Sequence, residues 1–231
     1  MPNDIVNNLK KIKSEINNIA DAAKRQKSDI KLLAVSKKQK ATDILRAFRA
    51  GQIDFGENYI QEFNAKQDEL TGHDIKWHFI GHIQRNKVKK LIGSTHLIHT
   101  LDRVPLAQTI ENLCTVKNIT QNCLIQVKLS KNENKEGCQP NDLFDFINDL
   151  NELSHIKICG LMTIGTLTND LRLTRSEFKQ LRELKDQINQ KKIYKHNLTH
   201  LSMGMSSDFK VAIEEGATIV RIGTDIFGKR T

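Results

Sequence analysis

The sequence predicts an α/β protein built as a (β/α)8 barrel of the TIM type, with an extra helix at its N-terminus. Two observations predict this fold. Short apolar or β-branched runs alternate with amphipathic helical segments, and there are eight such runs in one uninterrupted series. A chain of 231 residues is long enough for one complete barrel. We therefore expect a single domain over residues 1–231. A doubly wound open sheet is the competing architecture, and it needs a topological switch point that is not evident in the sequence.

The predicted elements follow one another in a regular order. Residues 1–28 form a helical segment in which Ile5, Leu9, Ile12, Ile16 and Ile19 recur every three or four positions, and we expect this apolar face to pack on the barrel. The predicted strands lie at 32–35, 53–55, 77–80, 97–100, 123–129, 158–164, 198–201 and 218–222. The predicted helices between them lie at 42–50, 58–70, 84–92, 104–117, 140–153, 176–190 and 207–215. Strands joined through helices pair in parallel, as a barrel requires.

Composition excludes several classes of protein. No apolar run approaches the roughly 18 residues of a membrane-spanning helix, and the first 30 residues lack the apolar core of a signal peptide. We therefore expect a soluble cytoplasmic protein. The four cysteines form no C-x-x-C, which argues against structural zinc and disulfides. His73, His78 and His82 lack carboxylate or cysteine neighbours at fixed spacing, so we expect no metal site.

The net charge of +9 raises the question of a nucleic-acid partner. The densest basic stretch, residues 85–90, contains no interleaved aromatic residue. Such a stretch is more typical of a solvated helix face than of a nucleic-acid site. We therefore expect no nucleic-acid partner, and a salt-dependent DNA shift assay tests this directly.

Lys37 is the first candidate site residue. It follows the apolar run at 32–35, at the carboxyl end of the first predicted strand, where barrel proteins gather their chemistry. Partial dehydration there disfavours the ammonium form and frees the amine as a nucleophile toward carbonyls. The alternative is a structural lysine whose stem covers the strand end while its charge stays in water.

The loops after the seventh and eighth strands suggest an anion site. Ser206 and Ser207 precede a predicted helix, whose first N–H groups lack partners within the helix. Gly223 permits close approach of the backbone, and Thr224 adds a hydroxyl donor. Barrels often bind phosphate with these two loops. Equally, Ser206 or Ser207 is an ordinary helix N-cap.

Arg221 lies among aliphatic residues in the last predicted strand. A buried, unpaired charge is costly, so Arg221 needs a partner. One candidate is an acidic residue of the barrel. The other is a ring nitrogen of a bound cofactor, which a permanently charged guanidinium would keep unprotonated.

Five segments carry a family resemblance. They are AVSK (34–37), FGENYIQE (55–62), WHFIG (77–81), LSMGMS (201–206) and VRIGT (220–224). Together, in this order, they resemble the pyridoxal phosphate homeostasis proteins, which are single-domain relatives of the alanine racemase N-terminal barrel. The matches run from about residue 31 to 230 and cover nearly the whole chain.

The resemblance implies that the chain binds pyridoxal 5'-phosphate (PLP) as a Schiff base on Lys37. It implies that Arg221 faces the pyridine nitrogen and that the phosphate lies at Ser206, Gly223 and Thr224, with Ser207 nearby. It also implies that Asn58 and His82 line the mouth of the pocket.

Two departures from the family pattern concern these loops. Residues 38–40 are Lys-Gln-Lys where the family usually shows a Thr-Lys-Pro type of sequence. Asp225 replaces a small residue and would repel a phosphate if its side chain pointed inward.

Two functions follow from the resemblance. One is a non-catalytic PLP carrier and regulator of vitamin B6 and amino acid balance, with no catalytic residue. The other is a PLP-dependent amino acid racemase, which needs an acid/base on each face of the cofactor. In racemase relatives, one of these is a tyrosine of an additional domain, which we do not expect in this chain. Tyr59 and Tyr194 match no such context. We favour the carrier, and expect a monomer with PLP and PLP-requiring apo-enzymes as its partners.

Overall fold

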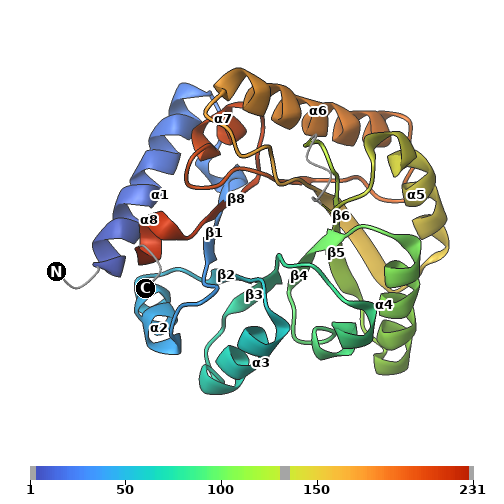
Figure 1. Ribbon diagram of the computed structural model, residues 1–231, viewed down its shortest axis with the longest axis horizontal. Coiled ribbons are helices and arrows are strands. Elements are labelled where there is room, and N and C mark those ends of the chain that lie inside the picture. The colour runs from blue at the N-terminus through green and yellow to red at the C-terminus, as the bar shows by residue number, and fades with distance from the viewer. Residues whose placement is uncertain (1–3, 131–135, 229–231) are drawn as a thin grey trace.

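Eight parallel strands close into a barrel in chain order, and the last strand pairs with the first (Figure 1). The computed structural model describes residues 4–130 and 136–228. The strands are β1 (Lys31–Val35), β2 (Asp54–Glu57), β3 (Lys76–Phe79), β4 (Leu97–Leu101), β5 (Gln121–Gln126), β6 (Ile156–Met162), β7 (His200–Ser202) and β8 (Ile219–Ile222). The predicted barrel is confirmed, and the carboxyl ends of its strands meet at one end.

Helices surround this sheet (Figure 1). The α-helices are α1 (Ile5–Ala22), α2 (Ala41–Arg49), α3 (Ile60–Glu69), α4 (Val104–Lys117), α5 (Leu143–Asp149), α6 (Leu171–Gln190), α7 (Phe209–Glu214) and α8 (Thr224–Phe227). Short 3-10 helices are η1 (Lys27–Asp29), η2 (Arg85–Lys90), η3 (Pro140–Asp142) and η4 (Leu150–Glu152). The α-helix predicted over 84–92 is wrong, because the chain forms only η2 there. Val88 within this tighter turn is still buried, as are Leu91 and Ile92 directly after it.

Strand boundaries differ from the predicted ones where polar residues enter the sheet. The sequence predicts a strand over 53–55, but β2 runs on through Gly56 and Glu57, both of which are buried. Ile53, an apolar residue, is instead 42% exposed. A reading based on hydrophobicity misses strand residues whose polar groups are hydrogen-bonded inside the protein.

The N-terminal helix α1 packs on the outside of the barrel against α2, α7 and α8 (Figure 1). Asp4 caps its first turn, because its side chain accepts a 3.1 Å hydrogen bond from the Asn7 N–H. All five apolar residues predicted to share a face are at most 7% exposed. The amphipathic helix predicted at the N-terminus is therefore confirmed.

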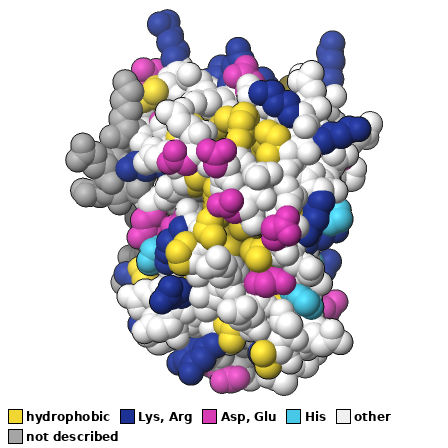
Figure 2. All heavy atoms as spheres, turned by 90° about the vertical axis from the view of Figure 1, so that its right-hand side faces the viewer, with side chains coloured by type: hydrophobic (Ala, Val, Ile, Leu, Met, Phe, Trp, Pro, Cys, Tyr) yellow, Lys and Arg dark blue, Asp and Glu magenta, His cyan; other side chains and the backbone are white. Residues whose placement is uncertain are grey.

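The protein surface carries charges of both signs. On the face shown in Figure 2, Lys and Arg side chains lie among Asp and Glu side chains. Across the described part of the chain, no helix combines the length and the apolarity needed to cross a membrane. All four cysteines are free thiols.

The barrel interior holds two buried histidines. His78 of β3 and His99 of β4 are both fully buried, and Nδ1 of His78 lies 2.9 Å from Nε2 of His99. Burial lowers the pKa of His78 from 6.5 to about 4, and burial also lowers the pKa of His99 well below its usual value. Both imidazoles are therefore neutral at neutral pH.

We expect stability to fall as the pH drops from 6.5 toward 4, the window set by the pKa of His78. Within it the unfolded chain binds a proton at His78 and the folded protein does not, so the free energy of unfolding falls by about 1.4 kcal/mol per pH unit from this residue. Urea unfolding across the window measures the slope. His78→Asn should make the slope shallower by about this amount and leave the part that the buried His99 contributes, whereas the exposed His196→Ala should leave the slope unchanged. An equally steep slope in His78→Asn would show that other groups cause it.

Candidate functional site

A pocket of about 250 Å³ opens at the carboxyl ends of the strands. It is lined by Val35, Lys37, Asn58, Ile80, Met162, Ile164, Met205, Ser206, Ser207, Arg221, Gly223 and Thr224. Seven of the eight predicted site residues, all except His82, lie in this lining. Closure of the barrel between β1 and β8 is what brings the two ends of the chain to one pocket.

Lys37 is held in the pocket through both of its neighbours. The Ser36 N–H donates to the Gly56 carbonyl at 3.0 Å, extending the pairing of β1 with β2. On the other side, the Lys38 N–H donates to Glu62 Oε2 at 2.7 Å. Lys38 has φ of 61° and an exposed side chain, and it does not line the pocket. The backbone therefore directs the two lysines to different environments.

A buried ion pair supports this loop from below. Lys66 Nζ of α3 lies 2.8 Å from Glu57 Oε1 and donates to the Ser36 carbonyl at 2.8 Å. The Ser36 hydroxyl also donates to Glu57 Oε1, at 2.6 Å. Burial raises the pKa of Glu57 despite the opposing effect of Lys66. Glu57 thus has a structural role: its carboxylate is a fixed hydrogen-bond acceptor beneath the loop that carries Lys37.

Asn58 directly follows β2 and lines the pocket. Its Oδ1 is buried and has no hydrogen-bond partner among the described residues. A side chain at Gly81 would place its Cβ 2.0 Å from the Asn58 carbonyl oxygen, so only glycine lets the chain after β3 pass there. An unpartnered, buried acceptor at a pocket wall is a group that a ligand can satisfy.

The loops after β7 and β8 form the opposite wall. The N–H groups of Ser206, Ser207, Gly223 and Thr224 make no hydrogen bond to any described residue. Neither serine is the N-cap of α7: that helix begins after Asp208, whose Oδ1 accepts from the Met205 N–H at 2.6 Å. This hydrogen bond closes the turn ahead of the helix. Both serines are therefore left in the turn, with their N–H groups available to an anion.

Two glycines shape this wall. Gly204 has φ of 91°, and a Cβ there would lie 2.5 Å from the Ala212 Cβ. A Cβ at Gly223 would lie 3.1 Å from the Val35 carbonyl oxygen, so a larger residue would disturb the junction of β1 and β8. Asp225 is exposed and does not line the pocket, so its carboxylate is not directed at the anion site.

Arg221 forms part of the pocket floor and is 5% exposed. Its NH1 donates to the Ser202 hydroxyl and its NH2 to the Thr163 carbonyl, each at 2.9 Å. Of the two candidate partners, a barrel carboxylate makes no ion pair with Arg221 among the described residues. Burial lowers the pKa of Arg221 to about 10, so the guanidinium remains charged at neutral pH.

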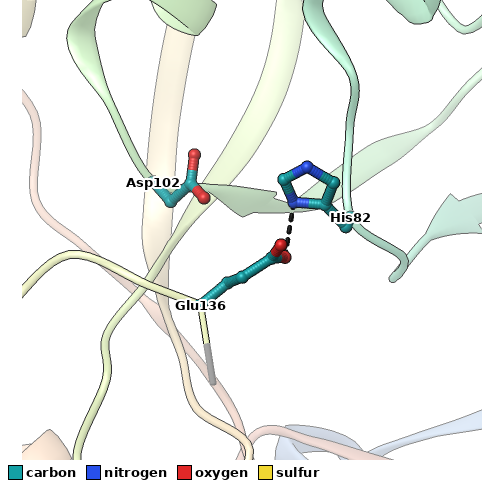
Figure 3. Close-up of side chains that lie close together, drawn as sticks. All are labelled: His82, Asp102 and Glu136. Carbon is teal, nitrogen blue, oxygen red and sulfur yellow. Dashed lines mark ion pairs between the residues drawn. The ribbon is translucent and has the colours of Figure 1, made fainter. Parts of the chain in front are cut away.

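His82 lies beside the pocket rather than in its lining. Its Nδ1 pairs with Glu136, and Asp102 lies close by (Figure 3). These three side chains offer ligand atoms within 4.8 Å of one another. Asp102, however, also pairs with Arg103 at 2.5 Å. A role for His82 at the cofactor stays a prediction.

Sequence reasoning missed the apolar walls of the pocket and the partners of Arg221. Val35, Ile80 and Met162 lie at or directly after the carboxyl ends of strands. The predicted strand ends are therefore the sequence feature from which these pocket residues could have been found. Ser202 and Thr163 carry no local signal of their own. Only the closed barrel places them beside the guanidinium.

Comparison with known families defines the class of this barrel. The family described as alanine racemase, N-terminal domain, matches residues 8–231. A pyridoxal phosphate homeostasis protein of Aquifex aeolicus is 46% identical over 189 residues, which are 81% of this chain and 82% of that protein. The chain belongs to the pyridoxal phosphate homeostasis protein family, as the resemblance in the sequence predicts.

Solved structures agree with this assignment. PipY of Synechococcus elongatus, determined with PLP bound, matches with a TM-score of 0.82 at 36% identity, over 92% of this chain and 99% of PipY. An alanine racemase of Clostridium difficile matches with a TM-score of 0.73 over 96% of this chain and 56% of the racemase. Its 17% identity supports the fold alone.

Proposed function

We propose that the chain binds PLP as a Schiff base on Lys37 and acts as a carrier in vitamin B6 and amino acid homeostasis, without efficient turnover. One observation carries the proposal: Lys37 and Arg221 line the same pocket as the last two loops, whose N–H groups have no hydrogen-bond partner among the described residues. The bound PLP of PipY, a relative at 36% identity, supports it. We place the protein in the cytoplasm as a monomer that passes PLP to apo-enzymes.

The pocket offers a matching group for each reactive part of PLP. Lys37 supplies the amine for the aldehyde, and Arg221 the fixed charge for the ring nitrogen. Ser206, Thr224 and the neighbouring N–H groups supply donors for the phosphate. Asn58 has polar atoms at the same pocket, and its Oδ1 lacks a partner in the described protein. The residues present therefore fit the cofactor.

Arg221 argues for binding over catalysis. When bound, PLP supplies an electron sink for carbanions, which is strongest when its ring nitrogen carries a proton. A guanidinium that stays charged at neutral pH disfavours a second positive charge on that nitrogen. Arg221 thereby limits the carbanion chemistry on which racemases depend.

Among the described residues, the pocket lining offers no second acid/base group of the kind that the racemase alternative needs. Lys37 and Arg221 are the only acidic or basic side chains in the described lining. Tyr59 is 46% exposed and lies outside that lining. Tyr194 is buried elsewhere, where its hydroxyl donates to the Ile156 carbonyl.

The holo-protein should show no sustained racemisation, transamination or decarboxylation of the common amino acids. It should instead restore activity to a PLP-requiring apo-enzyme. Chiral amino acid analysis measures the first expectation, with an authentic alanine racemase as the positive control. Turnover on the order of 1 per second or faster would favour the racemase over the carrier.

A further inference from the structure

A chain of hydrogen bonds runs from the pocket floor through the barrel to its opposite end. Beyond the contact of Arg221 with the Ser202 hydroxyl, that hydroxyl lies 2.9 Å from His99 Nδ1. His99 Nε2 lies 2.9 Å from His78 Nδ1, and His78 Nε2 lies 3.0 Å from Asp54 Oδ1. We call Arg221, Ser202, His99, His78 and Asp54 the histidine chain. Each is at most 6% exposed.

The two ends of the histidine chain determine its direction. A guanidinium only donates hydrogen bonds, and an ionised carboxylate only accepts them. Arg221 donates to the Ser202 oxygen, so the single Ser202 proton is available for His99 Nδ1. His99 then donates from Nε2 to His78 Nδ1, and His78 donates from Nε2 to Asp54. Both imidazoles are thereby fixed as neutral Nε2–H tautomers.

Asp54 is itself held as a carboxylate at the far end. Lys31 Nζ of β1 lies 2.9 Å from Asp54 Oδ1. The hydrogen bonds from His78 and Lys31 lower the pKa of Asp54 against the effect of burial. Besides these groups, the charged or titratable neighbours of the two imidazoles are His96, His200 and Arg221. The Asp54 carboxylate therefore stays ionised at neutral pH and accepts the hydrogen bond from His78.

We propose that Ser202, His99, His78 and Asp54 are positioning residues that fix the Arg221 guanidinium against the pyridine nitrogen of PLP. This inference rests on the proposed function and deepens it. Arg221 has two anchors, the Thr163 carbonyl and the Ser202 hydroxyl. The carbonyl is held by the backbone, whereas the hydroxyl rotates freely unless His99 accepts its proton. Asp54 fixes the His99 acceptor through its hydrogen bond with His78. The carboxylate at the amino-terminal end of the barrel thereby fixes the orientation of the Ser202 hydroxyl that anchors Arg221 in the cofactor pocket.

The first measurement needs no cofactor. Histidine ¹⁵N NMR of the apo-protein should show two buried imidazoles that are protonated at Nε2 and unprotonated at Nδ1 at neutral pH. Assignment comes from His78→Asn and His99→Asn spectra. A proton on His99 Nδ1 would reverse the chain and overturn the proposal, even if the variants bind PLP normally.

The second measurement uses the PLP-loaded protein. In Ser202→Ala the guanidinium keeps only the Thr163 anchor, so its field at the ring nitrogen weakens and that nitrogen takes up a proton more readily. The pH midpoint for protonation of the ring nitrogen, followed by ¹⁵N NMR of ring-labelled PLP, should move upward by about one unit or more. His96→Ala is the matched control, because its ring packs on His78 without a hydrogen bond in the chain, and its midpoint should not move.

The outcomes separate this inference from the proposed function. If Ser202→Ala loads PLP and keeps the wild-type pH profile, the positioning role is overturned and the carrier stands. If the wild-type protein retains no PLP, both fall. A shifted midpoint in Ser202→Ala, together with Nε2–H tautomers in the wild type, supports the positioning role, because loss of packing alone would not move the profile in this direction.

Discussion

Lys37→Ala should abolish the reducible PLP chromophore and leave a folded barrel. The Schiff base needs an amine at this position, and Lys37 lines the pocket while its neighbours are tied to β2 and α3. The backbone of the loop is held by groups other than the Lys37 side chain, so its removal should not disturb the fold. Absorbance after PLP loading and gel filtration measures the first effect, and circular dichroism the second.

Lys38→Ala is the matched control for this experiment. The two lysines are adjacent, but Lys38 is exposed and lies outside the pocket lining. Its removal should leave the chromophore unchanged. A chromophore that persists in Lys37→Ala and disappears in Lys38→Ala would transfer the attachment site to Lys38.

Ser206→Ala and Thr224→Ala should each weaken PLP retention about tenfold or more, and the double variant should weaken it by roughly a hundredfold or more. Each hydroxyl is expected to donate a hydrogen bond to a charged phosphate, and such bonds contribute roughly 1.5–3 kcal/mol each. The backbone N–H groups remain, so binding should weaken without vanishing. Equilibrium dialysis of PLP against each protein measures the change in Kd.

A second double variant, which removes two hydroxyl groups outside the pocket, serves as the control. Thr120→Ala, Ser176→Ala removes one exposed threonine and one exposed serine hydroxyl. It should bind PLP as the wild type does. Wild-type retention in the Ser206, Thr224 double variant would place the phosphate elsewhere.

The barrel could be predicted because its signal is local and repeated. Each strand is a short apolar run, and eight runs separated by helical segments leave few alternatives. Lys37 and the residues after β7 and β8 could be found for the same reason, because each directly follows an apolar run that predicts a strand. Once the strands close into a barrel, these residues necessarily lie at the same end of it and share one pocket.

The histidine chain and the ion pair beneath Lys37 could not be predicted in this way. His78 and His99 lie on neighbouring strands with no motif between them, and Ser202 joins them only because the barrel closes. Glu57 and Lys66 each look like surface residues in the sequence, yet both are nearly fully buried. Buried polar residues depend on partners that are distant in the chain, so composition and periodicity do not reveal them.

The most direct test of the central claim is to map the attachment site of PLP on the wild-type protein. The protein is loaded with PLP, reduced with borohydride, digested and analysed by mass spectrometry. We predict one phosphopyridoxyl adduct, on Lys37, together with loss of the visible absorbance band on reduction. A loaded protein whose band survives reduction, or whose adduct lies on another lysine, would contradict the account.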